Sequence, residues 1–252
     1  MLSITQDQLM GWLSPVLWPF LRVLAVMSST PILSSRAFPA RARVGFAFLV
    51  ALALQASLPL QPVIDVGSSA ALGAVLQQVG LGLAIGVAIR VVLSAVELAG
   101  EVIGFQMGLN FAAFFDPSLN SQSSAVARFL GQMSLYLFVV LNGPVLVLLA
   151  VQRSFERYPV DQNFLDALQR MRLFDLGRDV FASGLWIALP LVGLLLFVNI
   201  ALGIISRVAP QMNIFAIGFP ITLVAGLVGL TFTLPMLDQP LMALIQRALD
   251  MF

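Results

Sequence analysis

Residues 180–206 read VFASGLWIALPLVGLLLFVNIALGIIS and contain no charged side chain. At 1.5 Å per residue, a helix of this length covers about 40 Å, enough to cross the roughly 30 Å hydrocarbon core of a bilayer. Residues 129–152 and 214–237 are also free of charge and long enough to cross it. Because a helix satisfies its own backbone hydrogen bonds, these stretches predict three long helices surrounded by lipid or by other protein.

Three further segments predict helices, but each contains an arginine or is short for a membrane span. Residues 10–33 contain Arg22, residues 44–60 form a short stretch, and residues 70–96 contain Arg90. Hydrophobic residues make up 60% of the chain and charged residues 10%, against about 25% charged residues in a soluble domain. We therefore predict an all-α, polytopic membrane protein that forms one helical unit over residues 1–252.

Prolines interrupt the long apolar stretches and predict kinks in the helices, because each proline removes a backbone donor and frees a carbonyl. Broken helices of this kind occur near the substrate sites of secondary transporters, although most are kinks that neighbouring helices tolerate. The prolines in question are Pro144, Pro190, Pro220 and Pro235.

The charge and the missing residue types exclude several function classes. Thirteen arginines and twelve acidic residues give a net charge of +1, which provides no basic excess for nucleic acid. The absence of Cys and His removes thiol chemistry and the commonest metal ligand and general base. We predict no catalytic residue, no metal and no cofactor. The first eight residues contain Asp7 and no basic residue, so we expect no cleavable signal peptide.

Ionisable groups within or beside apolar helix are candidate functional sites, because desolvating them costs several kcal/mol. These are Arg22, Arg90, Glu97 and Glu101. They either pair and snorkel to hold helices in register, or form a proton or ion relay. The spacing of Gly100, Gly104 and Gly108 places three glycines on one helix face, a pattern typical of close helix packing.

Residues 97–128 start as an apolar helix and end in a polar loop. The cluster NFAAFF at 110–115 precedes Asp116-Pro117 and a run rich in Ser, Asn and Gln. Aromatic rings in a constriction exclude water, so this segment could act as a displaceable plug in a pore. The alternative is that Asp116 or Ser123 caps the next helix and the phenylalanines are core.

Residues 152–179 predict a polar connection, since five arginines and five acidic residues interleave there, with a short amphipathic helix near 164–174. Residues 180–252 are expected to form a helical hairpin. Arg36, Arg41 and Arg43 occupy a short loop without acids and favour a cytoplasmic side for it. The balanced charge of 152–179 leaves the topology of the other loops open.

Two sequence blocks resemble the FliR family of flagellar biosynthesis proteins. The first is GEVIGFQMGL at 100–109, followed by Phe111-Ala112 and Asp116-Pro117. The second, longer block includes RVAPQMNIFAIGFP at 207–220. Residues 141–144 read LNGP where the family often has a histidine after the glycine, which casts doubt on a role for that imidazole here.

The resemblance implies a structural subunit of the flagellar type III protein-export gate. Such a subunit forms, with FliP and FliQ and beside the export protein FlhB, a channel for unfolded flagellar subunits. The implied location is the bacterial inner membrane at the flagellar basal body, with some apolar helices covered by other subunits. The family's plug loop falls on residues 110–122, and we expect the plug to comprise Asn110, Phe111, Phe114, Phe115, Asp116, Pro117, Asn120, Ser121 and Gln122.

Helix packing and assembly are expected to rest on a second set of residues in the two blocks. These are Gly100, Glu101, Gly104, Gln106, Gly108, Arg207, Pro210, Gln211, Asn213, Phe215, Gly218 and Pro220. The alternatives are the injectisome homologue of the gate subunit and an autonomous secondary transporter that uses Arg90, Glu97 and Glu101. The segment Gly218–Ile221 lacks a following lysine and favours the flagellar form.

Overall fold

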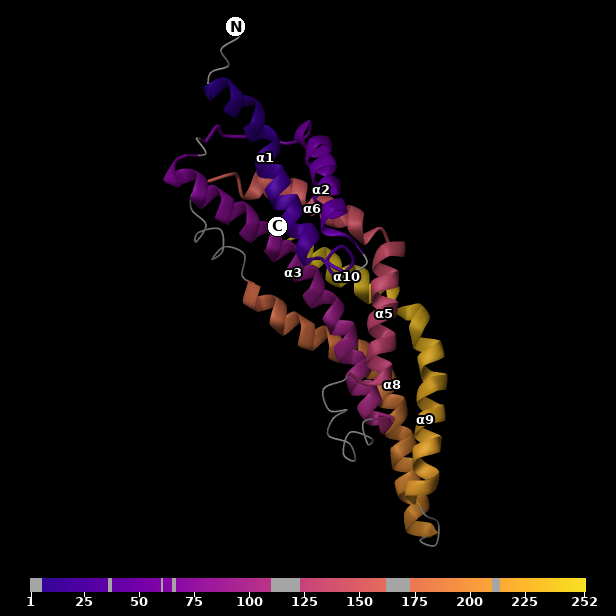
Figure 1. Ribbon diagram of the computed structural model, residues 1–252. Helices are drawn as coiled ribbons and strands as arrows, with labels where there is room; N and C mark the ends of the chain where they lie inside the picture. Colours follow the sequence, from indigo (N-terminus) through magenta and orange to yellow (C-terminus); the bar gives the residue numbers. More distant parts are fainter. Residues whose placement is uncertain are drawn as a thin grey trace. The chain divides into compact units, whose positions relative to one another are not determined.

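The computed structural model describes residues 6–35, 38–59, 61–64, 67–109, 123–161, 173–209 and 214–252. Within these ranges the chain is helical and has no strand, which confirms the all-α prediction. Figure 1 shows the helices and their labels. They are α1 (Gln6–Ser29), α2 (Ala40–Gln55), α3 (Ser69–Gln106), α5 (Ala125–Val140), α6 (Gly143–Arg157), α8 (Leu173–Val208), α9 (Ile214–Thr233), the 3₁₀ turn η3 (Leu234–Met236) and α10 (Asp238–Leu249).

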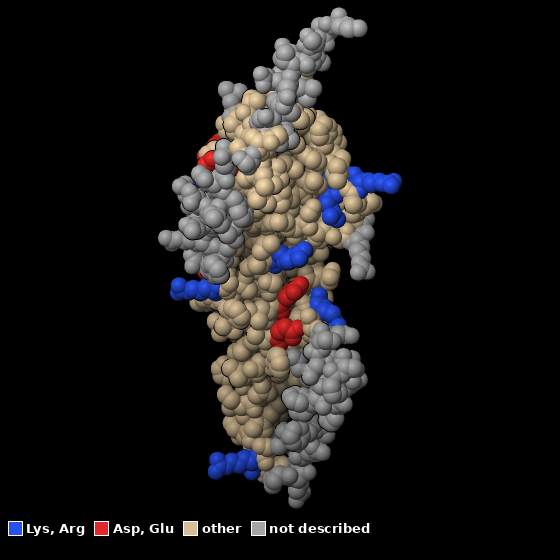
Figure 2. All heavy atoms as spheres, turned by 60° about the vertical axis from the view of Figure 1, so that its left-hand side comes forward, with Lys and Arg blue, Asp and Glu red and all other residues tan. Residues whose placement is uncertain are grey.

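Four helices in the described ranges are long and apolar enough to cross a membrane, and the broken pair α5 and α6 can supply a fifth crossing. This result confirms the prediction of a polytopic membrane protein. The four stretches are Gly11–Ser29, Ala70–Gln106, Leu176–Val208 and Ile217–Met236. Charged side chains are sparse on the face in Figure 2, where most of the described surface belongs to residues other than Lys, Arg, Asp and Glu.

The prediction of one continuous helix over residues 129–152 is wrong. The chain leaves the helical conformation at Asn142, whose φ of 58° and ψ of 27° lie in the left-handed region. Pro144 follows within the first two positions of α6, where its missing N–H is tolerated. Proline alone does not enforce such a break, since Pro190 and Pro220 lie inside the continuous helices α8 and α9. The left-handed Asn142 ends α5, and Pro144 then starts a new helix.

Helix α3 is longer than the sequence predicted. The expected helix covered residues 70–96, with a separate region beginning at residue 97, but α3 continues without a break to Gln106. It therefore contains Glu97, Glu101 and the three-glycine motif up to Gly104. The short helix expected near 164–174 falls mostly outside the described residues, and α8 begins at Leu173.

The chain groups into two compact units. The first contains residues 1–91, 142–176 and 245–252, and the second contains residues 92–141 and 177–244. In the first unit α1 packs against α2, where Phe20 and Phe48 meet edge to face with ring centroids 6.2 Å apart. Ala47 and Ala51 of α2 are buried.

In the second unit, glycines allow helices to approach closely. A Cβ placed on Gly184 of α8 would lie 2.8 Å from the carbonyl oxygen of Ala95 in α3. A Cβ on Gly229 of α9 would collide with Leu191 of α8, so the two helices of the C-terminal hairpin lie side by side, as Figure 1 shows. Close packing at small residues is the usual way in which membrane helices associate.

Candidate functional site

The second half of α3 packs against α5 through Gly100. A Cβ on Gly100 would lie 2.9 Å from the backbone nitrogen of Ala127 and 3.0 Å from the carbonyl oxygen of Val126. Both neighbours are backbone atoms, which cannot move aside independently of the helix. Gly104 is buried one turn further along the same helix. Gly100 therefore lies at a close contact between two helices, and the assembly role of Gly100 and Gly104 stays a prediction.

Glu101 fixes the start of α5. Its Oε1 accepts a hydrogen bond of 2.9 Å from the backbone N–H of Ser124. The hydroxyl of Ser124 in turn accepts from the N–H of Ala127 at 3.1 Å and caps the helix. A half-buried carboxylate near a helix N-terminus is favourable because unpaired N–H groups give that end a partial positive charge. Glu101 is therefore a bridge between α3 and α5.

The end of α3 is attached to α9. Gly108 has a φ of 77°, a conformation that suits glycine at the end of a helix. The hydroxyl of Thr222 lies 3.4 Å from the carbonyl oxygen of Met107, to which it can donate, and 3.0 Å from that of Phe219. Gly226 of α9 leaves room for the fully buried Met107 side chain. The prediction that Gly108 shares a helix face with Gly100 and Gly104 is wrong, because α3 ends at Gln106 and Gly108 adopts a positive φ beyond it. The sequence gave no signal for the contacts of Met107 and Thr222.

The predicted plug lies outside the described residues, so its role stays a prediction. All nine of its expected members belong to residues 110–122: Asn110, Phe111, Phe114, Phe115, Asp116, Pro117, Asn120, Ser121 and Gln122. The described chain stops at Leu109 and resumes at Ser123. Both flanks are fixed within the second unit, one by the contacts of Met107 and Gly108 with α9 and the other by the bond from Glu101 to Ser124.

The other predicted packing residues are only partly described. Gln106 is half-buried, Arg207 is exposed near the end of α8, Gly218 is buried and Pro220 is exposed. Phe215 belongs to α9, but its side chain lies outside the described part, as do Pro210, Gln211 and Asn213. The packing role of this second block therefore stays a prediction.

The four ionisable groups in apolar helix have different surroundings. The exposed Glu97 extends over Gly131 of α5, where a Cβ would lie 2.8 Å from its Oε1. In the first unit the Nη2 of Arg90 lies 3.4 Å from the hydroxyl of Ser34. Glu101 binds the start of α5, as described above. Arg22 has the most elaborate surroundings.

Arg22 is completely buried in the first unit. Its Nε donates to Oε1 of Gln78 at 2.8 Å, its Nη1 to the hydroxyl of Ser154 at 2.8 Å and its Nη2 to the carbonyl oxygen of Tyr158 at 3.0 Å. The guanidinium also lies 3.6 Å from the ring centroid of Phe155, within the range of a cation–π contact. Burial of the cation is thus compensated by neutral acceptors and an aromatic face.

Sequence reasoning named Arg22 as a group that requires a partner, but it did not find the partners. The signal that could have found them is Gln77-Gln78, a polar pair in the middle of apolar α3. Gln77 continues the network, because its Nε2 donates to the carbonyl oxygen of Pro159 and its Oε1 accepts from the N–H of Asp161. The arginine and the two glutamines therefore hold α1, α3 and the chain after α6 together.

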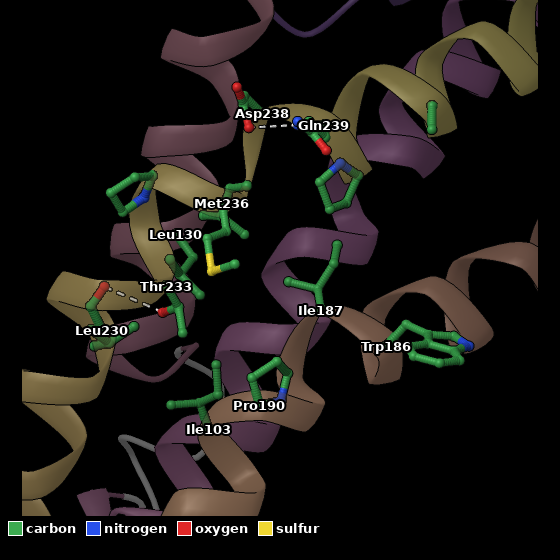
Figure 3. Close-up of a pocket in the computed structure, with 14 residues that line it drawn as sticks. Ile103, Leu130, Trp186, Ile187, Pro190, Leu230, Thr233, Met236, Asp238 and Gln239 are labelled. Atoms are coloured by element: carbon green, nitrogen blue, oxygen red, sulfur yellow. Dashed lines mark hydrogen bonds between the residues drawn. The ribbon is translucent and has the colours of Figure 1, made fainter.

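A cleft of about 670 Å³ opens in the second unit. Figure 3 shows its apolar lining, with Asp238 and Gln239 as the polar groups at the start of α10. The backbone N–H of Gln239 donates to the Asp238 carboxylate at 2.7 Å. Trp186 at the rim is 74% exposed, so the cleft presents a large aromatic surface. Its lining comprises Ile103, Leu130, Trp186, Ile187, Pro190, Leu230, Thr233, Pro235, Met236, Leu237, Asp238, Gln239, Pro240 and Ala243.

No cluster of three or more acidic side chains with metal-binding geometry is present in the described ranges. The described residues instead show helix packing: glycine contacts, helix caps and one buried cation.

Residues 13–248 match the model of the family described as bacterial export proteins, family 1. The chain belongs to this family.

Relatives in the export family confirm the resemblance to FliR. The flagellar biosynthetic protein FliR of Escherichia coli K12 is 39% identical over 237 residues, covering 94% of this chain and 90% of the relative. FliR of Pectobacterium carotovorum is 36% identical over the same shares of the two chains. FliR of Bacillus subtilis is 28% identical over 84% of this chain and 82% of its own. These relatives are named for flagellar biosynthesis and not for a catalysed reaction.

Proposed function

We propose that this chain is a non-catalytic structural subunit of the flagellar type III protein-export gate. In this proposal it forms, with FliP and FliQ, the channel for unfolded flagellar subunits, next to FlhB, in the bacterial inner membrane at the flagellar basal body. Membership of the bacterial export family and similarity to FliR support an export role. The structural observation that carries the proposal is the attachment of both flanks of residues 110–122 to one packed unit.

This attachment suits a plug that opens and closes repeatedly. Glu101 holds the chain at Ser124. At the other end the buried Met107 side chain packs against Gly226 of α9, and the Thr222 hydroxyl lies 3.4 Å from the Met107 carbonyl oxygen. Both ends of the segment therefore contact helices of the second unit. A loop attached at both ends can move out of a pore and return to the same position, because its reach is limited by its own length. In the proposal Phe111, Phe114 and Phe115 occlude the closed channel. Residues 120–123 allow the displacement, because Ser124, which the sequence would have included, is held by Glu101 and caps α5.

The exposed surface of the C-terminal hairpin supports a role in a larger assembly. Phe197 and Val208 of α8 are 77% and 80% exposed, and Phe232 of α9 is 73% exposed. The apolar part of α8 contains 33 residues, which as a helix extend about 50 Å, well beyond the roughly 30 Å of hydrocarbon. The hydrocarbon core is too thin to cover this whole length, so we propose that helices of partner subunits cover part of it.

The first test of this proposal is native mass spectrometry of the tagged chain, co-expressed with FliP and FliQ of the same organism and extracted in detergent. We expect a defined hetero-oligomer that contains all three proteins. A stable particle that contains this chain and neither partner would overturn the gate assignment. It would favour an autonomous transporter instead.

The second test addresses the plug in a gate that is assembled but not secreting. Deleting residues 118–122 shortens the loop without touching Glu101 or Ser124, and we expect greater ion leakage across the membrane. Gln61→Ala, in the connection after α2, is a control that leaves the loop intact. Equal leakage in the deletion variant and the parent, with both assembled to the same extent, would refute the plug.

A further inference from the structure

The N-terminal part of the chain carries an uneven distribution of charge. Residues 1–96 contain five arginines and two aspartates, whereas the rest of the chain contains eight arginines and ten acidic residues. Three of these five arginines lie close together in the sequence: Arg36 precedes α2, and Arg41 and Arg43 belong to its first turn. Arg90 of α3 adds a fourth cation, because its Nη2 lies 3.4 Å from the hydroxyl of Ser34, which also precedes α2.

The fold itself gives Arg41 and Arg43 little compensation. They lie in the first turn of α2, where the helix dipole is positive and disfavours cations, and this turn contains no acidic residue. Arg41 is exposed. Arg43 has one long contact, 3.4 Å from its Nη2 to the carbonyl oxygen of Phe38, and its buried Nε has no hydrogen-bond partner. The guanidinium of Arg41 and the Nη groups of Arg43 therefore retain donors for an anion from outside the chain, whereas the buried Nε of Arg43 does not.

The face of α2 that carries Arg41 also presents apolar side chains. Leu49 is 63% exposed, and Phe48 is 46% exposed although its ring also meets Phe20 of α1. Phe46, away from this face, is 46% exposed as well. Residues 41, 45, 48, 49 and 52 share one face of the helix by their spacing. A Cβ on Gly45 would meet nothing within 4 Å, so this face is open. Figure 1 shows α2 beside α1.

We propose that α2 forms a binding surface for an anionic phospholipid, with the headgroup at its N-terminal end. Arg41 and Arg43 bind the headgroup phosphate, with Arg90 adding positive charge near Ser34. The exposed apolar side chains of α2 contact the acyl chains. The 16 residues of α2 extend about 24 Å, less than the hydrocarbon core, so a guanidinium at one end reaches the headgroup level. The arginines bind an anion and the side chains beside them bind apolar groups. An anionic lipid supplies both, whereas a purely apolar partner helix supplies no anion.

The test measures lipid binding to the full-length chain, purified in a neutral detergent. The probes are dioleoylphosphatidylglycerol and dioleoylphosphatidylcholine, which share acyl chains and differ in headgroup charge. Retention of each lipid is followed by native mass spectrometry across a titration. The variants are the double substitution Arg41→Gln with Arg43→Gln, the double substitution of both to Lys, and Arg247→Gln, which removes an exposed arginine of α10. Far-UV circular dichroism checks that each variant is helical.

We expect phosphatidylglycerol to bind more tightly than phosphatidylcholine to the parent. An arginine near an anionic headgroup contributes on the order of fivefold in affinity, so the double Gln variant should lose roughly 25-fold for phosphatidylglycerol and little for phosphatidylcholine. The double Lys variant should recover most of the affinity, and Arg247→Gln should behave as the parent does. Equal affinity of the parent for the two lipids, or an unchanged affinity in the double Gln variant, would overturn the proposal. So would a second protein chain that occupies this surface and is released by the double Gln variant.

Discussion

Replacing Arg22 with alanine tests whether the buried cation holds the first unit together. The substitution removes the donor from three acceptors: Oε1 of Gln78, the hydroxyl of Ser154 and the carbonyl oxygen of Tyr158. It also removes the guanidinium from the face of Phe155. The side chain is completely buried, so water does not replace these contacts without opening the packing.

The magnitude follows from these contacts. Each buried acceptor that loses its donor costs about 1 kcal/mol or more, and the lost cation–π contact and the cavity add about 1 kcal/mol each. Relief from burying a cation offsets part of this sum. We therefore expect Arg22→Ala to lower the free energy of unfolding by about 3 kcal/mol, which for a chain of this size shifts Tm by roughly 6 to 12 °C.

The assay is thermal unfolding of the purified full-length chain in detergent, followed by far-UV circular dichroism. Arg22→Met keeps most of the side-chain volume and isolates the loss of the hydrogen bonds. The control Arg247→Ala removes an exposed arginine and should change Tm by no more than about 2 °C. If Arg22→Ala melted within 2 °C of the parent, the buried network would contribute nothing measurable, and the reasoning about its acceptors would be wrong.

Three further predictions concern single positions. Gly100→Ala places a Cβ against the backbone of α5 and should lower the free energy of unfolding by about 2 kcal/mol, measured by thermal unfolding. Gly193→Ala has open space around the new Cβ and should be neutral or slightly stabilising. Equal effects of the two substitutions would refute the close approach at Gly100. Glu101→Gln keeps an oxygen acceptor for the N–H of Ser124 and should preserve gate assembly, measured by native mass spectrometry. Glu101→Ala removes this acceptor and should weaken assembly. A loss of ion-coupled uptake in the Gln variant would instead indicate a transporter. Asn142→Gly should leave thermal stability nearly unchanged, and Asn142→Val should lower it by about 1 to 2 kcal/mol, because a β-branched residue disfavours a φ of 58°; similar Tm values for the two variants would contradict this.

Hydrophobicity predicted where helices occur but not where they stop. Residues 180–206 lie entirely within α8, since a charge-free stretch of this length has no lower-energy state than helix in an apolar surrounding. Residues 129–152 look equally apolar, yet the chain breaks at Asn142 because of local backbone geometry at Asn142-Gly143-Pro144. Hydropathy does not report backbone conformation, so the break was visible only as a proline and a glycine in sequence.

The candidate site was predictable where it depends on local spacing. The helical period places Gly100 and Gly104 on one face, and Gly100 lies at a close contact with α5. The period failed for Gly108, because α3 ends at Gln106 and hydrophobic spacing does not indicate where a helix stops. The partners of Arg22 are 56 to 136 residues away in sequence, and no periodicity connects them. Their positions depend on the tertiary fold. The sequence therefore predicted that Arg22 requires a partner but not which residues supply it.

The long sequence separation within the Arg22 network also has a consequence for biosynthesis. Tyr158, the most distant acceptor, follows Arg22 by 136 residues. At 5 to 20 residues per second, a ribosome needs roughly 7 to 27 s to synthesise this interval. During that time α1 has to partition between the translocon and the lipid with a cation that lacks its final acceptors, at a cost of a few kcal/mol. The position of α1 in the membrane is therefore stabilised fully only after the second half of the chain, which supplies the acceptors in Ser154 and Tyr158, has been synthesised.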